Sequence, residues 1–299
     1  MFDTLQPNKI GELFTSQALN SLANGNINII SDILDKHFEN IEYPITIADA
    51  FEIVYSYLSS FYKSEYLFKN IITNNLFLSK SLQKNAVMLS EFRVGQSKAD
   101  CVIVDNYSTC YEIKTSLDNL KRLPDQLNDY LSLFDKVYVV CDKSHLDKVN
   151  DVCPEEVGII ELTTNNNLIK KRKATRIVTP VNAITLINSL RANEYKYIAE
   201  RISKSSINVP NVDLYDHCIN ILLNDQTNNL RKLFIEAIKE YRKNNHAFIE
   251  SLPRSLKSSA ISFNIPPRHQ KELKSIMSKY IQKDYITCTS HSCEVSSLS

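Results

Sequence analysis

The chain has 299 residues and 43% hydrophobic content, which suffices for one large domain or two ordinary ones with a sizeable core. Its formal net charge is only +1 with 23% charged residues, so the composition excludes a protein that is basic over its whole surface. Any surface that binds nucleic acid must therefore be local.

Further classes of protein are excluded by what the sequence lacks. No segment approaches the ~20 uninterrupted apolar residues of a membrane span, and the amino terminus has no apolar signal core. The seven cysteines are irregularly spaced and several lie in apolar runs, which favours a cytoplasmic protein with free thiols. Four glycines cannot form a P-loop or a dinucleotide fingerprint, and HExxH and GxSxG are missing.

The amino-terminal part of the chain is predicted to be helical. Apolar residues recur at helical spacing over residues 9–75, and the break at Pro44 separates a lead-in, residues 1–44, from the next helical stretch. In that stretch, over residues 45–77, Phe51, Val54 and Leu58 belong to one apolar stripe. Glu65 comes seven residues after Leu58 and falls on the same line, where a carboxylate needs a functional reason.

A strand rhythm begins near Ala86. The segments "AVMLSEFRV", "ADCVIVD" and "TCYEIKT" have the pattern of three strands joined by short turns, an antiparallel meander. Helical spacing returns from Leu120, followed by the strand "KVYVVCD", a short helix around "HLDKVNDVC" and the strand "VGIIEL". This order predicts an α/β sandwich with a mixed central sheet, and we assign residues 45–180 to this core.

The rest of the chain is expected to be helical over residues 181–284. The strongest periodicity lies in residues 186–199, 214–223, 230–241 and 270–281. These helices are candidates for binding substrate, a protein partner or a second copy of the chain. Residues 285–299 are small and polar and are expected to form a disordered tail.

Three charged side chains interrupt two apolar strands in the middle of the chain. Glu112 and Lys114 are two residues apart in one strand and point to the same face, and Asp100 opens the strand before it. If Asp100 lies near Glu112, the two carboxylates can hold one divalent cation through oxygen, as Mg²⁺ requires. Lys114 would then flank a phosphate bound to that ion.

This pattern resembles the PD-(D/E)XK nuclease superfamily, in which an Asp opens one core strand and Glu-x-Lys follows in the next. In its RecB-like branch the helix after these strands carries Gln-x-x-x-Tyr, matched here by Gln126 and Tyr130. The string from Glu91 to Val140 is also similar to a largely uncharacterised bacterial subgroup. The resemblance covers residues 63–162 and departs from the superfamily's name at Ala99, where Pro would stand.

The resemblance implies a metal-dependent nuclease that hydrolyses phosphodiester bonds, with DNA favoured over RNA, in phage defence or a mobile element. Asp100, Glu112 and the carbonyl of Ile113 would hold Mg²⁺ or Mn²⁺. Glu91 in the first strand, or Glu65 in the preceding helix, would hold a second metal or its water. Such an ion polarises the scissile phosphate and lowers the pKa of water.

The resemblance also assigns roles to three other side chains. Lys114 would stabilise the charge that develops on the phosphate or orient the water. Gln126 and Tyr130 would contact the nucleic-acid backbone or brace the lysine.

Each of these residues has an ordinary structural interpretation as well. Glu112 and Lys114 could form an exposed pair that contributes ~0–1 kcal/mol, and Glu65 could be half of an i, i+4 helix pair with Lys69. Glu91 could simply face solvent. Four basic residues could bind a phosphate backbone or form a solvated loop: Lys170, Lys171, Arg172 and Lys173.

Two other functions stay open on the same residues. A nuclease-like fold can bind nucleic acid or protein without cutting it, in which case no metal-dependent cleavage is expected. Alternatively, the helices could form an interaction module beside a vestigial core, which predicts a stable partner and no bound metal.

Overall fold

The computed structural model describes residues 10–38, 41–79, 85–225 and 229–282. The chain divides into two compact units, Met1–Tyr62 with His246–Ser299 (unit 1) and Lys63–Asn245 (unit 2). This division differs from the expected boundaries after residues 44 and 180, because residues 45–62 join unit 1 and the C-terminal helical region splits after Asn245. The expected disordered tail lies outside the described residues.

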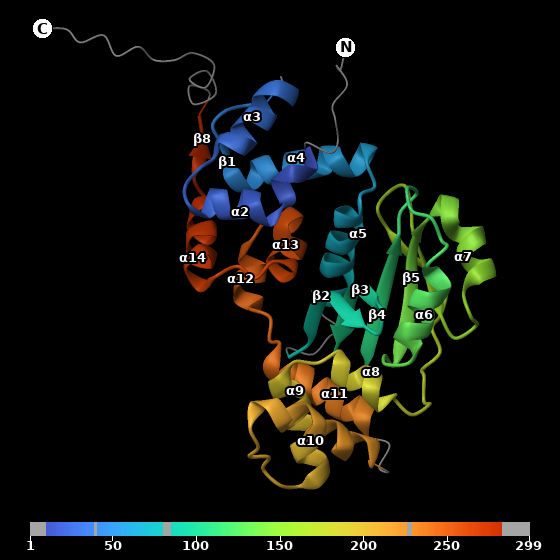
Figure 1. Cartoon of the computed structure of the whole chain (residues 1–299). Coiled ribbons are helices and arrows are strands. Elements are labelled where there is room, and N and C mark those ends of the chain that lie inside the picture. Colours follow the sequence, from blue (N-terminus) through green and yellow to red (C-terminus); the bar gives the residue numbers. More distant parts are fainter. Residues whose placement is uncertain (1–9, 39–40, 80–84, 226–228, 283–299) are drawn as a thin grey trace, which may run out of the picture. The chain divides into compact units, whose positions relative to one another are not determined.

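Unit 1 is built from helices taken from both ends of the chain (Figure 1). Its elements are η1 (Glu12–Phe14), α2 (Ser16–Ala23), α3 (Asn28–His37), β1 (Ile45–Thr46), α4 (Ile47–Phe61), α12 (His246–Ser251), η4 (Arg254–Leu256), α13 (Lys257–Ser262), α14 (Pro267–Ile276) and β8 (Tyr280–Ile281). The helix expected over residues 270–281 is shorter than predicted, because Ile281 lies in β8 and pairs antiparallel with Ile45.

The long stretch over residues 45–77 is broken into two helices. Phe51, Val54 and Leu58 are buried on α4, as their spacing predicts. Tyr62 is extended, and the hydroxyl of Ser64 caps a new helix, α5 (Glu65–Ile72), by accepting a hydrogen bond from the Leu67 amide. Glu65 therefore does not continue the stripe of Leu58. It begins α5 with its side chain 55% exposed, so the inward-facing position predicted from the spacing is wrong.

Unit 2 contains a six-stranded sheet in the order β2-β3-β4-β5-β6-β7. The strands are β2 (Val87–Val94), β3 (Ser97–Val104), β4 (Ser108–Lys114), β5 (Lys136–Asp142), β6 (Gly158–Leu162) and β7 (Leu168–Arg172). The first three form the predicted antiparallel meander, β4 to β6 run parallel, and β7 is an antiparallel edge strand. The α/β class with a mixed sheet is thus confirmed.

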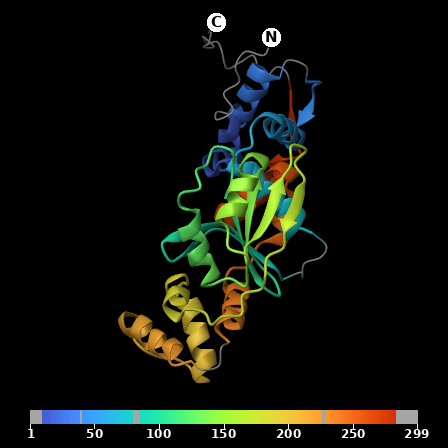
Figure 2. The ribbon, with the colours of Figure 1, turned by 90° about the vertical axis from the view of Figure 1, so that its right-hand side faces the viewer.

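The other helices of unit 2 lie beside this sheet or gather at one end of it (Figures 1 and 2). Besides α5 they are η2 (Thr73–Phe77), α6 (Leu123–Leu131), η3 (Lys143–His145), α7 (Leu146–Val152), α8 (Ala183–Asn188), α9 (Ala192–Ser203), α10 (Asn211–Leu223) and α11 (Leu230–Tyr241). Phe92 of β2, Phe134 and Phe234 of α11 pack with ring centroids 6.0 to 6.2 Å apart. This contact explains why residues 181–245 belong with the sheet. Among the described residues, no helix is long and apolar enough to cross a membrane.

Candidate functional site

Three carboxylates lie at the same level on three neighbouring strands. Ser90 pairs with Cys101 and Phe92 pairs with Ala99, so Glu91 and Asp100 stand opposite each other between these pairs. On the other side of β3, the last pair is Cys101 with Tyr111, and the next residues outward are Asp100 and Glu112. We call Glu91, Asp100 and Glu112 the carboxylate row. Like charges directly opposite one another destabilise a sheet, so this arrangement has an energetic cost.

The backbone at Glu91 is left-handed, with φ of 57° in the middle of β2. A side chain other than glycine costs roughly 1–2 kcal/mol in this conformation. Such strain is concentrated at functional sites in proteins, where it aims a side chain that regular geometry would point elsewhere. The deviation occurs at the residue that faces Asp100, which supports a functional role for Glu91.

Asp100 lies at the centre of the row, where β3 and β4 separate. Its Oδ2 accepts a hydrogen bond of 2.7 Å from the backbone amide of Ile113. Burial and the negative charge of Glu112 raise the pKa of Asp100 well above its usual value, and the hydrogen bond from Ile113 offsets this only in part. The charge of Glu65 raises the pKa further. Asp100 thus carries more negative charge around it than the nearby cations balance.

Glu112 and Lys114 are not an exposed pair. Glu112 is 2% exposed, and the Lys114 ammonium donates a 2.8 Å hydrogen bond to its Oε1. The same ammonium donates to Oε1 of Gln126 on α6 at 3.0 Å. The expectation that Gln126 braces the lysine therefore agrees with this contact.

Tyr130 lies one helical turn after Gln126 and contacts the same strand. Its hydroxyl donates a 2.9 Å hydrogen bond to Oε2 of Glu112, and the whole residue is 0% exposed. A side chain buried to this extent cannot touch a nucleic-acid backbone, so the substrate-binding role expected for Tyr130 is corrected. Burial and the negative charge of Glu112 raise the pKa of Tyr130, which keeps the hydroxyl protonated and donating. Tyr130 fixes the orientation of Glu112.

A second group of charges lies on the other side of Asp100. Lys69 of α5 is 9% exposed, and its ammonium donates to Glu91 Oε1 and, at 2.6 Å, pairs with Glu65 Oε1. Lys98 pairs with the second oxygen of Glu91 at 2.7 Å. Burial opposes the ionised form of Glu91, yet the hydrogen bonds from Lys69 and Lys98 hold its pKa below the usual value.

Sequence reasoning missed two residues of this site, Lys98 and Lys69. Lys69 entered only as a possible i, i+4 partner of Glu65, and that pair does form. The burial of Lys69 within the run from Leu67 to Ile72 is set by the packing of α5, so the sequence alone carries no clear signal for it.

The donors fit a hard divalent cation. Within the described residues, one carboxylate oxygen each from Glu65, Glu91 and Asp100 lies within 4.8 Å of the other two. The charge of Glu112 also acts on Asp100. Carboxylate oxygens are the preferred ligands of Mg²⁺ and Mn²⁺, and the uncompensated charge around Asp100 is of the kind that such an ion neutralises.

The basic run expected to bind phosphate is part of edge strand β7. The Arg172 guanidinium donates to the backbone carbonyls of Val157, Cys153 and Pro154. It therefore anchors the segment that precedes β6 and is not directed at a ligand. Lys171 pairs with Glu161 at 2.8 Å. Lys170 lies 5.8 Å from the ring centre of Tyr138. The expected loop is a strand up to Arg172, but Lys170, Lys171 and Lys173 are exposed to solvent, and phosphate binding by these three lysines stays a prediction.

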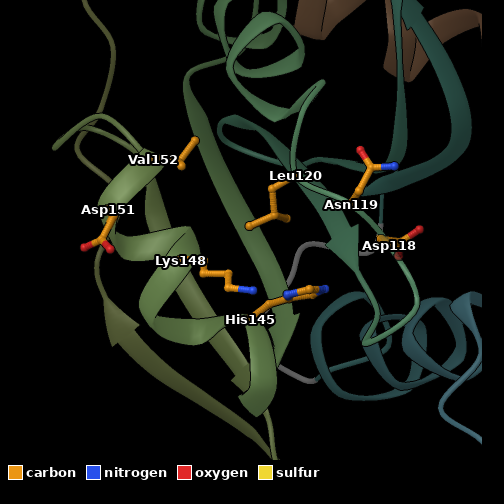
Figure 3. A pocket seen from close by; sticks show the side chains of 7 residues that line it. All are labelled: Asp118, Asn119, Leu120, His145, Lys148, Asp151 and Val152. Atoms are coloured by element: carbon orange, nitrogen blue, oxygen red, sulfur yellow. The ribbon is translucent and has the colours of Figure 1, made fainter.

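An open pocket of about 430 Å³ lies where β4 and β5 end (Figure 3). Its walls come from the loop after β4 and from η3 and α7: Asp118, Asn119, Leu120, His145, Lys148, Asp151 and Val152. The ring nitrogens of His145 are buried and find no hydrogen-bond partner among the described residues. Sequence reasoning missed this pocket, because polar loop residues carry no periodic signal that brings two distant segments together.

Comparison with known proteins finds a similar protein in a bacteriophage. Protein cII of Enterobacteria phage P4 is 26% identical over 179 residues, which is 58% of this chain and 66% of the relative. The match thus spans just under two thirds of that protein's length. A solved structure of a protein of unknown function from Silicibacter pomeroyi is 14% identical and covers 42% of this chain and 85% of its own, with a TM-score of 0.27.

The strongest of these findings is a family match over residues 59–264, which includes every residue of the carboxylate row and of its surroundings. The matched span is more than half of the chain. The chain therefore belongs to the family described as bacteriophage P4 protein cII.

Proposed function

We propose that this chain is a divalent-metal-dependent nuclease of the PD-(D/E)XK type, RecB-like branch. The observation that supports it best is the carboxylate row, which brings Asp100 and Glu112 to one level with Lys114 beside them. A buried or partly buried group of like charges is costly unless it binds something positive. Clusters of like charges that destabilise the folded state occur more often at functional sites than elsewhere in proteins.

Asp100, Glu112 and the carbonyl of Ile113 are the groups we assign to the ion. When bound, Mg²⁺ or Mn²⁺ supplies polarisation of the scissile phosphate and a more acidic water. Tyr130 and Lys114 hold the two oxygens of Glu112 in a fixed orientation, which keeps this ligand in place before substrate arrives.

Lys114 is suited to bind the phosphate that is cut. An ammonium group has three N–H donors, and the contacts with Glu112 and Gln126 use two of them. The third remains for a phosphate oxygen. Because the lysine is only 10% exposed at its side chain, its charge acts in a partly dry environment, where it stabilises developing negative charge more strongly than in water.

The experiment is a cleavage assay with the purified full chain on single-stranded DNA, duplex DNA and RNA, each with Mg²⁺, Mn²⁺ or EDTA. We expect cleavage with metal, preferentially of DNA, and a loss of roughly 10²-fold or more in Asp100→Asn and Lys114→Met. Asp213→Asn on α10 and Lys232→Met on α11 are matched controls at exposed positions and should cut normally. Cleavage that persists in both site variants contradicts the proposal.

The second candidate is a nucleic-acid-binding protein of the same fold that does not cut. It is favoured by one side chain, since Lys69 already pairs with both Glu65 and Glu91 without any metal. Binding of DNA that is unchanged by EDTA, without cleavage in any metal, would select it over the nuclease. The family match to a phage protein supports a setting in a mobile element for either candidate, while a role in phage defence stays an expectation from the resemblance.

A further inference from the structure

We infer that Lys69 is a built-in cation that takes the place of a second metal ion, so that the site binds one divalent ion and not two. The inference rests on the proposed metal site and specifies its stoichiometry. It makes Lys69 a positioning residue, because Lys69 acts through Glu65 and Glu91 and not on the substrate.

The contacts of Lys69 carry the first step. Its ammonium bonds Oε1 of Glu65 at 2.6 Å and Oε1 of Glu91, the two carboxylates that would otherwise be ligands for a second ion. Two catalytic ions stand ≈ 3.5–4 Å apart, and the oxygens of Glu65, Glu91 and Asp100 lie within 4.8 Å of one another. An ammonium inside a cluster of this size leaves no room for a second ion beside the first.

Burial is the second step. The side chain of Lys69 is 11% exposed, and α5 holds it within the buried run that includes Phe68 and Ile71. The two carboxylates are more open, since the side chains of Glu65 and Glu91 are 55% and 41% exposed, so it is the burial of the lysine itself on α5 that keeps the ammonium in place. Lys69 is therefore a fixed part of the site and not a surface side chain that a metal displaces.

The balance of formal charge gives the third step. Four carboxylates meet here (Glu65, Glu91, Asp100 and Glu112), together with three ammonium groups (Lys69, Lys98 and Lys114). One negative charge is left. A single divalent ion turns this into one positive charge, which suits an anionic phosphate, whereas two ions would leave three positive charges in a small volume.

The conformation of Glu91 agrees with this role. Its left-handed backbone lies where β2 faces Asp100, and its two oxygens are divided between Lys69 and Lys98. Both oxygens of Glu91 pair with a positive charge, which makes it a poor ligand for a further ion, whereas Oε2 of Glu112 accepts only from the neutral hydroxyl of Tyr130. Glu65 and Glu91 then anchor Lys69 next to Asp100, in place of the metal role that their position in the sequence implies.

The test counts metal ions without relying on activity. Mn²⁺ alone is titrated into the full chain, and bound ions per chain are measured by electron paramagnetic resonance and by calorimetry. We expect one bound Mn²⁺ in the wild type, one in Lys69→Arg, which keeps the charge, and two in Lys69→Met, which frees Glu65 and Glu91. The triple variant Lys69→Met, Glu65→Gln, Glu91→Gln should return to one.

Each outcome is decisive. Two tightly bound ions in the wild type, or a single ion of unchanged affinity in a folded Lys69→Met, overturn the inference while leaving the proposed nuclease intact. A wild type that binds no Mn²⁺ overturns both. If Lys69→Met does not fold, Lys69→Gln, which removes the charge but keeps a polar side chain beside Glu65 and Glu91, takes its place: two bound ions are expected, and one ion in the folded variant overturns the inference.

Discussion

Asp100 occupies the central and electrostatically costly position of the carboxylate row. Its carboxylate faces Glu91 on one side and Glu112 on the other, and its pKa is raised by burial and by the charge of Glu112. An acid with a raised pKa in the folded state binds its proton more readily there than in the unfolded chain. Its contribution to stability is therefore fully present below the unfolded pKa of about 3.9 and is lost as pH rises through the folded pKa.

We predict that Asp100→Asn stabilises the protein at pH 8 in EDTA. Asparagine keeps the acceptor for the Ile113 amide and removes the charge, so the free energy of unfolding should rise by about 0.5–1 kcal/mol. Urea unfolding from pH 4 to pH 8 should show a fall in stability with pH that is smaller in the variant. Adding Mn²⁺ should reverse the order, since it stabilises only the wild type. Parallel pH profiles would contradict the prediction.

Glu91 allows the backbone strain to be measured separately from the charge. Glu91→Ala and Glu91→Gly both lose the pairs with Lys69 and Lys98, but only glycine relieves the left-handed conformation. At an ordinary strand position glycine is less stable than alanine by roughly 0.5–1 kcal/mol. We predict that Glu91→Gly is at least as stable as Glu91→Ala in urea unfolding.

Ser90 is the control for that comparison, because it precedes Glu91 in β2 and pairs regularly with Cys101. Ser90→Gly should be less stable than Ser90→Ala by the usual amount. A penalty for glycine of equal size at both positions would show that Glu91 is not strained.

The sequence identifies some of these residues and not others for physical reasons. Asp100, Glu112 and Lys114 are predictable because the alternation of strand side chains fixes which residues share a face and a short turn fixes which strands pair. Glu91 was named, but its left-handed backbone was not predictable, since glutamate has no preference for that conformation. Lys69 depends on the docking of α5, which is a tertiary contact.

At the scale of the elements, α6 acts as a brace for β4. Gln126 and Tyr130 are four residues apart and so lie on one face of the helix. They reach Lys114 and Glu112, which are two residues apart on the strand. One turn of the helix and two residues of the strand cover a similar length, so the two contacts form side by side. They fix the side chains of Glu112 and Lys114 before any ligand binds.

We predict that Tyr130→Phe lowers stability and disorders Glu112. The change removes a buried hydrogen bond to a charged group, which costs about 1.5–3 kcal/mol. Tyr215→Phe is the control, because its hydroxyl also donates to a side chain, Asn188, but at the surface, and should cost much less. Chemical unfolding measures both. Equal losses in the two variants would show that the contact with Glu112 carries no special weight.

Elements with a clear apolar rhythm were predicted well, and those without it were not. Strands β2 to β6 follow from runs of Val, Ile and Cys that alternate or are wholly buried. In β7, "LIKKR", three of five residues are basic, and the strand exists because β6 offers a free edge and Glu161 pairs with Lys171. Local composition cannot reveal a strand that depends on its neighbour.

At the scale of the whole molecule, unit 2 is one continuous segment, whereas unit 1 is assembled from two segments. All residues assigned to the candidate site lie within Lys63–Asn245. The hydrophobic core of unit 2 includes β2 to β6 together with α6 and α9 to α11, so it is complete without residues of unit 1. The predicted boundaries differ from these units because the apolar periodicity of a helix does not indicate which other element its apolar face packs against.

We predict that residues 63–245 fold alone and bind Mn²⁺ as the full chain does. Circular dichroism with urea unfolding should show one cooperative transition. Residues 1–62 alone should lack such a transition, since part of their unit comes from residues after Asn245. A fragment 63–245 without cooperative unfolding would show that its core needs unit 1.

The pairing of Ile45 with Ile281 sets an order of events during synthesis. At roughly 5–20 residues per second, β1 leaves the ribosome on the order of ten seconds before β8 exists. During that interval the complete segment of unit 2 emerges and can fold. The apolar side chains of Leu19, Ile30 and Phe51 cannot yet be fully buried, because the part of unit 1 that follows Asn245 has not been synthesised. The nascent chain would thus carry a folded unit 2 with the candidate site and an incompletely folded amino-terminal segment that exposes apolar side chains. We therefore expect chaperones on the ribosome to bind α2 to α4.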